Sequence, residues 1–329
     1  MSSQDQAPQQ GAQPTRTGLG ITLGLGASLA FATSGVFARP LLEVGWTPGA
    51  AVFWRVALAS VLLLPAGLWA MRGRLRELVS EWRLLAGFGA LAVATAQLFY
   101  FAAVSRLSVG VALLIEYLAP VALVLLAVLR TRRLPGRLVL TGTAVSVVGL
   151  VCVLDLTGAR LDGLGVLFGL LAMCGAAGYF VMGAHPTRLP AIALPAFGLP
   201  VGAAVLGLAI LVRLLPYSAP LVDVTLIGAT LPWWVPLSVV VVVATAIAYV
   251  LGVAGIPLMG ERLASFVSLS EVLFAALLAA ALLGETPTPI QLVGGVLIVL
   301  GVLAIRLSSG RSPAGLPTLP DELEAAEGD

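Results

Sequence analysis

Long apolar runs separated by short polar breaks follow one another along most of the chain. Between Gly18 and Arg306 the runs approach the roughly 20 residues that an α-helix needs to cross about 30 Å of hydrocarbon. Because lipid offers no partner for a free backbone N–H or C=O group, we expect these runs to be helices. The breaks delimit ten candidate spans: 19–38, 48–70, 84–104, 107–129, 138–157, 163–184, 191–212, 233–254, 263–283 and 288–306.

The two ends of the chain differ in composition from the apolar region. Residues 1–17 are rich in Gln, Pro, Ser and Thr, and residues 308–329 are polar and acidic. Such segments cannot bury enough apolar surface to offset the entropy cost of folding, so both are predicted to be disordered tails. The first apolar run is longer than the core of a signal peptide and has no clear cleavage site after it, which predicts a retained span.

The basic residues are distributed unequally over the predicted loops. All 18 are arginines, and one of them, Arg55, falls inside a span. With ten spans, 13 of the others lie on one side of the membrane and 4 on the other. Because cytoplasmic loops carry the excess of positive charge, this pattern places both termini in the cytoplasm. The larger group comprises Arg16, Arg72, Arg74, Arg76, Arg83, Arg130, Arg132, Arg133, Arg137, Arg188, Arg262, Arg306 and Arg311.

Composition points to the same class of protein. Apolar residues make up 59% of the 329 residues and charged residues 10%, whereas a soluble domain has about 45–50% and about 25%. The net charge of +2 is too small and too scattered for a nucleic-acid partner. Cys152 and Cys174 lie in apolar runs without metal-ligand spacing, so we interpret both as packing residues. We expect no metal site and no cofactor.

The chain also contains a weak internal repeat. Residues 107–151 match residues 259–303 at an offset of 152. The repeated unit holds five spans, and an odd number of spans inserts the second copy upside down. The prediction is two inverted repeats, 18–157 and 158–307, a plan typical of secondary transporters with a substrate site near the midplane. The aligned pairs with most weight are Pro135 with Pro287, Gly142 with Gly294 and Gly149 with Gly301.

Two charged residues lie inside predicted spans at similar depth. Glu116 is nine residues beyond Leu107 and Arg55 is seven beyond Pro48, which places them about 13 Å and about 10 Å below the same face. A charge at the bilayer centre costs at least about 2.5–3.5 kcal/mol, so it is rarely kept without a partner or an aqueous cavity. We predict that the two pair or jointly face a polar cavity, where they hold a zwitterion or Glu116 carries a proton. The alternative is a structural ion pair.

A second acid and several polar or aromatic side chains complete the candidate path. Glu271 is eight residues beyond Leu263, about 12 Å inside the opposite face, which puts one acid in each half of the membrane. We interpret it as part of a substrate or proton path; the alternative is a neutral, hydrogen-bonded structural carboxyl. Serine hydroxyls often bond only to their own helix. The other candidates are Gln97, Tyr117, Tyr100, Tyr249, Ser34 and Ser268.

Three stretches carry a resemblance to a known family. They are "FWRVALASVLLL" (53–64), "GVALLIEYLAPVALVLL" (110–126) and "LSEVLFAALLAAALLGETPTPIQLVGGVLIVLGV" (269–302). The ten-helix layout with these stretches resembles the drug/metabolite transporter superfamily, and the repeated unit resembles the EamA domain. Within that superfamily the chain is most similar to threonine/homoserine exporters. One departure is "RTRRLP" (130–135), which aligns Arg133 with Glu285 of the family's "GE" pair.

The resemblance implies an all-α integral membrane protein of ten helices that works by alternating access. The expected function is export of a small polar metabolite, with a threonine- or homoserine-like amino acid first, possible proton coupling, and no enzyme activity. A sugar, nucleotide, quaternary amine or drug, moved in either direction, is the alternative within carriers. A membrane enzyme would need a cluster of acids or histidines, yet His185 is the sole histidine; a channel is a further alternative. We expect a monomer or homodimer in the bacterial inner membrane.

Overall fold

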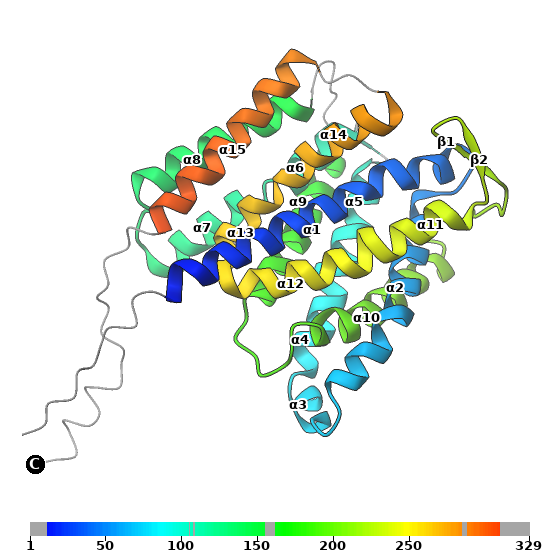
Figure 1. The fold of residues 1–329 in the computed structure, drawn as a ribbon, viewed down its shortest axis with the longest axis horizontal. Helices are drawn as coiled ribbons and strands as arrows, with labels where there is room; N and C mark the ends of the chain where they lie inside the picture. Colours follow the sequence, from blue (N-terminus) through cyan, green and yellow to red (C-terminus); the bar gives the residue numbers. More distant parts are fainter. Residues whose placement is uncertain (1–11, 105, 108, 155–161, 285–287, 310–329) are drawn as a thin grey trace, which may run out of the picture.

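The computed structural model describes residues 12–104, 106–107, 109–154, 162–284 and 288–309. In this part of the chain almost every regular element is a helix (Figure 1). The symbol η marks π-helical winding in the text. The helices are α1 (Ala12–Glu43), α2 (Pro48–Ala70), α3 (Leu75–Ser80), α4 (Trp82–Gly87), η1 (Phe88–Thr95), α5 (Ala96–Val104), α6 (Val109–Glu116), α7 (Ala119–Thr131), α8 (Arg137–Leu154), α9 (Gly163–Gly183), α10 (Ala193–Leu211), α11 (Trp234–Val241), η2 (Val242–Ile247), α12 (Ala248–Met259), α13 (Glu261–Ser268), α14 (Ser270–Leu283) and α15 (Pro289–Ser309).

Helices cover all ten predicted spans where the structure describes them, with short interruptions. Among the described residues nine helical stretches are long and apolar enough to cross a membrane, and the tenth, over Arg137–Val153, is shorter. The prediction for that span ran to residue 157, and residues 155–157 lie outside the described part. The chain is therefore a multi-pass membrane protein, with nine crossings supported by helix length and composition.

The predicted N-terminal tail overlaps a helix. α1 begins at Ala12, inside the segment 1–17 that was predicted to be disordered. Pro14 lies in the first turn of this helix, where the N–H group that proline lacks is not needed for a helical hydrogen bond. The rest of that tail, residues 1–11, and residues 310–329 of the C-terminal tail lie outside the described residues.

A small β-hairpin corrects the all-α prediction. Between α10 and α11, strands β1 (Val224–Leu226) and β2 (Ala229–Leu231) pair antiparallel. β1 buries its first and third side chains and exposes the second, as the period of a strand requires. Ile227 and Gly228 form the turn with φ angles of 53° and 73°, the signs of a type I′ turn. The sequence did not reveal it because two three-residue strands leave too short a pattern and Ile-Gly is an unusual turn pair.

The turn residue Ile227 leads to a prediction about stability. An L-residue in the left-handed region costs about 1–2 kcal/mol, and asparagine tolerates that region far better. Because Ile227 is 62% exposed, little packing is lost, and we expect Ile227→Asn to raise the free energy of unfolding by about 1 kcal/mol. Thermal unfolding in detergent measures this, with the β-branched Ile227→Val as control. A less stable Ile227→Asn protein would contradict the prediction.

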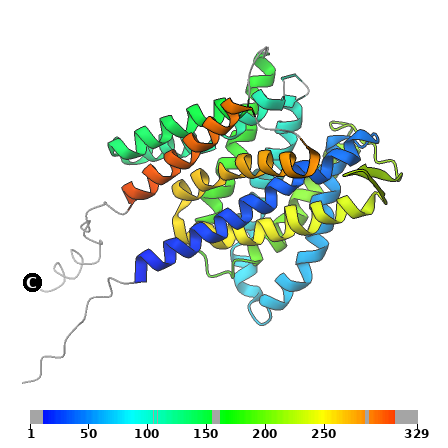
Figure 2. The ribbon, with the colours of Figure 1, turned by 45° about the horizontal axis from the view of Figure 1, so that its top comes forward.

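The helices pack in pairs that recur with the two halves exchanged. The fifth span, α8, packs extensively on the tenth, α15, and the second, α2, on the seventh, α10. The first span contacts the eighth, α1 with α12. The inverted counterpart of this contact is also present, because the sixth span contacts the third, α9 with α5. Figure 1 shows the α8–α15 pair at one edge of the bundle and the α2–α10 pair at the other, and Figure 2 again shows α8 beside α15.

Four glycines show this inversion at single residues. Gly142 and Gly149 on α8 are the sequence equivalents of Gly294 and Gly301 on α15. In the structure they meet crosswise, because Gly149 faces the backbone of Gly294 and Gly142 faces that of Gly301. A Cβ at Gly149 would lie 2.6 Å from the Gly294 carbonyl oxygen, so this approach requires glycine. Crosswise pairing of equivalent residues is what a two-fold axis between the repeats produces.

The fourth and ninth spans are both interrupted near their middle. Two residues separate α6 from α7, and one separates α13 from α14. Pro120 explains the first break, because its ring lacks an N–H group and clashes with the carbonyl four residues earlier, that of Glu116. At the second break the hydroxyls of Ser268 and Ser270 each donate to a carbonyl three residues earlier at 2.7 Å, which competes with regular winding.

On the face that carries the hairpin, the corner between α1 and α2 is bonded to the segment after α10. The Thr47 N–H group donates to the Ser218 carbonyl at 2.9 Å, and the Thr47 hydroxyl donates to the Pro216 carbonyl at 3.0 Å. The Trp46 indole donates to the Pro220 carbonyl at 2.8 Å. These uncharged hydrogen bonds join the first repeat to the second on this face.

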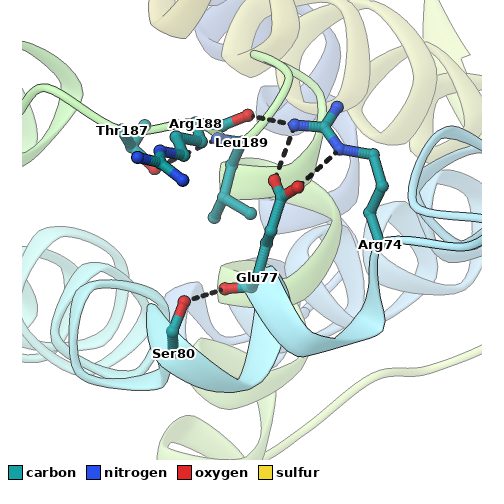
Figure 3. Close-up of polar contacts among 6 residues, drawn as sticks. All are labelled: Arg74, Glu77, Ser80, Thr187, Arg188 and Leu189. Atoms are coloured by element: carbon teal, nitrogen blue, oxygen red, sulfur yellow. Dashed lines mark hydrogen bonds and ion pairs between the residues drawn. The ribbon is translucent and has the colours of Figure 1, made fainter.

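On the opposite face, Arg74 joins the loop before α3 to the segment before α10 (Figure 3). Its guanidinium donates to both carboxylate oxygens of Glu77, at 3.0 and 2.6 Å, and to the Arg188 carbonyl at 2.6 Å. This contact is the inverted equivalent of the Thr47 contact, because it joins the second-to-third loop to the sixth-to-seventh loop. The hydrogen bond from Arg74 lowers the pKa of Glu77 below its ordinary value.

The lowered pKa of Glu77 predicts how this loop responds to acid. A carboxyl whose pKa is lower in the folded state stabilises the fold above its unfolded pKa, about 4.3, and stops doing so as the pH falls through the lowered value. We therefore expect amide exchange in the loop to be unchanged by pH, after correction for the intrinsic rate, down to about pH 4 and to accelerate below it. Hydrogen exchange measures this. Glu77→Gln should exchange faster already at pH 7; equal rates at pH 7 would contradict the prediction.

Candidate functional site

The guanidinium of Arg55 lies among packed helices with hydrogen-bonding capacity left over. It comes from α2 and donates one Nη1 hydrogen bond to the Ser34 hydroxyl of α1, at 3.1 Å. Its Nε–H group is buried and has no hydrogen-bond partner. Among the described residues no carboxylate oxygen lies within 4.0 Å of it. The direct Arg55–Glu116 ion pair, one of the two predicted arrangements, is therefore not formed.

Both predicted acids nevertheless face Arg55. Glu116 at the end of α6 and Glu271 in the first turn of α14 each interact electrostatically with Arg55 and with each other. All three side chains keep part of their surface accessible, although helices enclose them. Glu116 lies at the break in the fourth span and Glu271 at the break in the ninth. We name Arg55, Glu116 and Glu271 the charged cluster.

Tyrosine hydroxyls surround the charged cluster. Tyr117 interacts electrostatically with Glu271 and with Glu116. Tyr100 interacts electrostatically with Glu116, and Tyr249 interacts with Arg55 and both acids. These three predicted site residues and Ser34 therefore assemble with the charged cluster from four different spans.

Below the charged cluster lies a group of aromatic side chains that we name the aromatic cluster: Phe31, Phe88, Tyr179 and Tyr249. Ring centroids are 5.3 Å apart for Phe31–Tyr249, 5.8 Å for Tyr179–Tyr249 and 6.2 Å for Phe88–Tyr249. The Tyr179 hydroxyl is buried without a hydrogen-bond partner. Phe31 and Phe88 are additions to the residues predicted for the site, because aromatic residues in an apolar span carry no separate signal in the sequence.

Distances along the helices show which of the two clusters lies closer to the face that carries the hairpin. Arg55 lies about 10 Å from the start of its span at the hairpin face. Tyr249 lies fifteen residues from Trp234 at that same face, about 22 Å along its span, and Phe88 lies about 9 Å from the opposite end of its own. The aromatic cluster therefore lies between the charged cluster and the face that carries α3. Tyr249 is 5% exposed and Phe88 is 0% exposed, so the bundle is densely packed there.

Two predicted site residues do not join the charged cluster. Gln97 is half-buried on α5, and its side-chain amide makes no hydrogen bond to any described residue. The Ser268 hydroxyl donates to the Ser265 carbonyl of its own helix at 2.7 Å, which is the structural alternative stated for serines above. Ser268 contributes to the break before Glu271 rather than to the contacts around Arg55.

A separate cavity of about 320 Å³ lies between α14, α15 and the end of α8. Its lining is apolar except for Gln291, and it contains no member of the charged cluster. The Gln291 side chain is already engaged, because it donates to the Val153 carbonyl at 3.3 Å and accepts from the Thr288 N–H group at 2.8 Å. The lining of this cavity therefore offers no free hydrogen-bonding group to a polar substrate. Among the described residues no three metal-ligating side chains gather at one place.

An inverted pair of helical repeats around an enclosed charged cluster is the architecture of a membrane transporter. A family model described as the EamA-like transporter family matches residues 18–155 and 163–307. The chain belongs to this family. The sequence matches no curated protein. One solved crystal structure of another protein is 20% identical and superimposes with a TM-score of 0.68 over 92% of this chain and 100% of that one, a likeness that concerns the fold alone.

Proposed function

We propose that the protein is a secondary active transporter that exports small polar metabolites by alternating access, with threonine- or homoserine-like amino acids as the first candidates. The observation that carries the proposal is the charged cluster, in which Arg55 has an unpartnered Nε–H group beside two carboxylates that it does not contact directly. The site thus has free donors for an anion and free acceptors for a cation.

An α-amino acid has the groups that this cluster lacks. The planar guanidinium of Arg55 can bind a carboxylate through two parallel N–H bonds, which lysine cannot do. The ammonium group of the same substrate fits between Glu116 and Glu271. The hydroxyls of Tyr117 and Ser34 are the groups of this site that we expect to hydrogen-bond a side-chain hydroxyl of the substrate.

Charge balance supports coupling to protons. Two carboxylates and one guanidinium leave the cluster with one net negative charge, and an amino-acid zwitterion does not change that sum. A net charge within a membrane is costly, so one proton on Glu116 or Glu271 neutralises the empty site. The ammonium group of the substrate competes with that proton for the same carboxylates, so proton and substrate bind in turn. We infer exchange of one proton for one substrate.

The excess negative charge and the tyrosines favour a second candidate, an organic cation such as a quaternary amine. Such a cation would neutralise the cluster without a proton, and aromatic faces attract it further. It would leave the free donors of Arg55 unused, whereas an amino acid engages them, which is why we place the amino acid first. The two candidates differ in whether transport requires a proton gradient.

Counterflow into proteoliposomes tests the proposal. Vesicles loaded with one unlabelled amino acid at a time would be followed for uptake of labelled threonine, in parallel with a labelled quaternary amine. Saturable uptake of threonine supports an amino-acid substrate. A change of internal pH during net threonine movement, in vesicles without amino acid on the opposite side, supports proton exchange. Uptake of the amine alone moves the assignment to organic cations, and saturable exchange of neither, with folded protein, removes both substrates. Everted cell membrane vesicles with an imposed proton gradient then give the direction of transport.

The same proposal places the protein in a bacterial inner membrane as a monomer or homodimer, with both termini in the cytoplasm. A membrane-impermeant maleimide on intact cells tests the orientation, in a variant with Cys152 and Cys174 replaced. A cysteine at exposed Thr225 in the hairpin should react, and one at exposed Arg76 in α3 should react only after the membrane is opened. The reverse labelling would invert the orientation.

A further inference from the structure

The third and eighth spans contain π-helical turns at equivalent places in the two repeats. The tetrapeptide "VATA" occurs at 93–96, where η1 ends and α5 begins, and again at 243–246, within η2. In each, the threonine hydroxyl donates to the carbonyl five residues earlier, from Thr95 to Ala90 and from Thr245 to Val240, at 2.8 Å in both. The Thr143 hydroxyl in α8 instead bonds the carbonyl four residues earlier, as in an ordinary α-helix. The same bond thus occurs twice, once in each repeat.

These turns lie where the repeats meet. η1, from the first repeat, packs on α9 and α10 of the second, and η2, from the second repeat, packs on α1 and α2 of the first. At Gly175 of α9 a Cβ would lie 2.6 Å from the backbone nitrogen of Ala96, directly after η1. Thr245 is fully buried. A change of winding in either turn would therefore displace one repeat against the other.

The π winding also determines where the aromatic cluster points. A π-helical turn takes about one residue more than an α-helical turn, and one residue corresponds to about 100° of rotation in an α-helix. Tyr249 follows η2 by two residues, and Phe88 is the first residue of η1. If η2 rewound as an α-helix, Tyr249 would turn by about 100° away from Phe31 and Phe88.

We propose that Thr95 and Thr245 are positioning residues. Their hydroxyls hold a matched pair of π-helical turns that keep the aromatic cluster closed beneath the charged cluster. Rewinding of these turns to α-helix withdraws Tyr249 and Phe88 and opens that end of the site. The inference rests on the proposed function only for the statement that the opening serves a transported substrate.

Two substitutions at each of the two threonines separate the hydroxyl from the shape of the side chain. Thr245→Val keeps the shape and removes the hydroxyl, Thr245→Ser keeps the hydroxyl, and Thr95 receives the same pair; Thr143→Val, which removes an ordinary α-helical bond, is the matched control. In counterflow we expect each valine variant to lower Vmax up to about tenfold, the effect of one buried hydrogen bond, with KM nearly unchanged because the charged cluster is intact. The serine variants and Thr143→Val should behave like wild type.

A second readout does not depend on any substrate. Hydrogen exchange of the amides in residues 240–250 should accelerate up to about tenfold in Thr245→Val and remain at the wild-type rate in Thr245→Ser and Thr143→Val. A structure of the Thr95→Val/Thr245→Val protein should show α-helical winding and a displaced Tyr249 ring. If no tested substrate is exchanged but these changes appear, the proposed function fails and the positioning role stands. If the valine variants keep π winding, slow exchange and full Vmax, the positioning role is overturned.

Discussion

Replacing Arg55 by methionine is expected to abolish substrate exchange. Methionine fills a similar length of space but leaves Glu116 and Glu271 without the positive charge that both of them face. Truncating one member of a buried charged group costs about 2–5 kcal/mol, so we expect the rate of counterflow at low substrate concentration to fall at least about thirtyfold. The loss should be largest for substrates that carry a carboxylate.

Two further variants control for folding and for charge. Arg55→Lys keeps the charge without the planar fork and should retain part of the exchange with a raised KM. Arg55→Met combined with Glu116→Gln restores one net negative charge, and we expect it to recover the yield of monodisperse protein without recovering exchange. Full exchange by Arg55→Met, at a normal yield, would show that Arg55 does not bind the substrate.

Replacing Gly149 by alanine is expected to destabilise the protein strongly. The new Cβ would lie 2.6 Å from the Gly294 carbonyl oxygen and 2.8 Å from the Ile298 backbone nitrogen, and backbone atoms cannot rotate away as a side chain can. Overpacking of this kind costs about 1–3 kcal/mol, so we expect α8 and α15 to separate and the free energy of unfolding to fall by about 2 kcal/mol.

The matched control for that substitution is Gly35→Ala in α1, where nothing lies within 4 Å of the new methyl group. Alanine is the better helix former by about 1 kcal/mol, so this variant should be at least as stable as wild type. Titration with denaturing detergent, followed by circular dichroism, measures both. Equal stabilities of the two alanine variants would show that the α8–α15 crossing can open at little cost.

The sequence predicts the membrane helices well because each span must satisfy its own backbone and be apolar to its full length. The sequence also predicts Arg55 and Glu116 as site residues, because a charged residue stands out in an apolar run. The rise per residue of a helix then gives the depth of that residue in the membrane. The glycine register at the offset of 152 reports the crosswise pairing of Gly149 and Gly294, although only the structure shows which copy meets which.

Other parts of the site depend on non-local geometry. The proximity of Glu271 to Glu116 depends on two helix breaks, of which only Pro120 leaves a local signal. The π winding at Thr95 and Thr245 has a trace in the repeated "VATA", but such a short match among alanines and valines gains meaning only when both copies bond the carbonyl five residues earlier. The left-handed backbone conformation at Ile227 is one that isoleucine rarely adopts. The hairpin turn is therefore determined by tertiary context and not by the local sequence.

The backbone of the two repeats is nearly symmetric, but Arg55 occurs once. Its helix, α2, has α10 as its inverted counterpart, and α10 contains no charged residue. In a symmetric carrier, exchanging the roles of the repeats would give two end states of equal free energy. Here the guanidinium approaches the acids from one repeat only. If the protein alternates between two end states as we propose, these states differ in free energy and are unequally populated at rest. Such a carrier would have a preferred side from which it first meets its substrate, even before any gradient is applied.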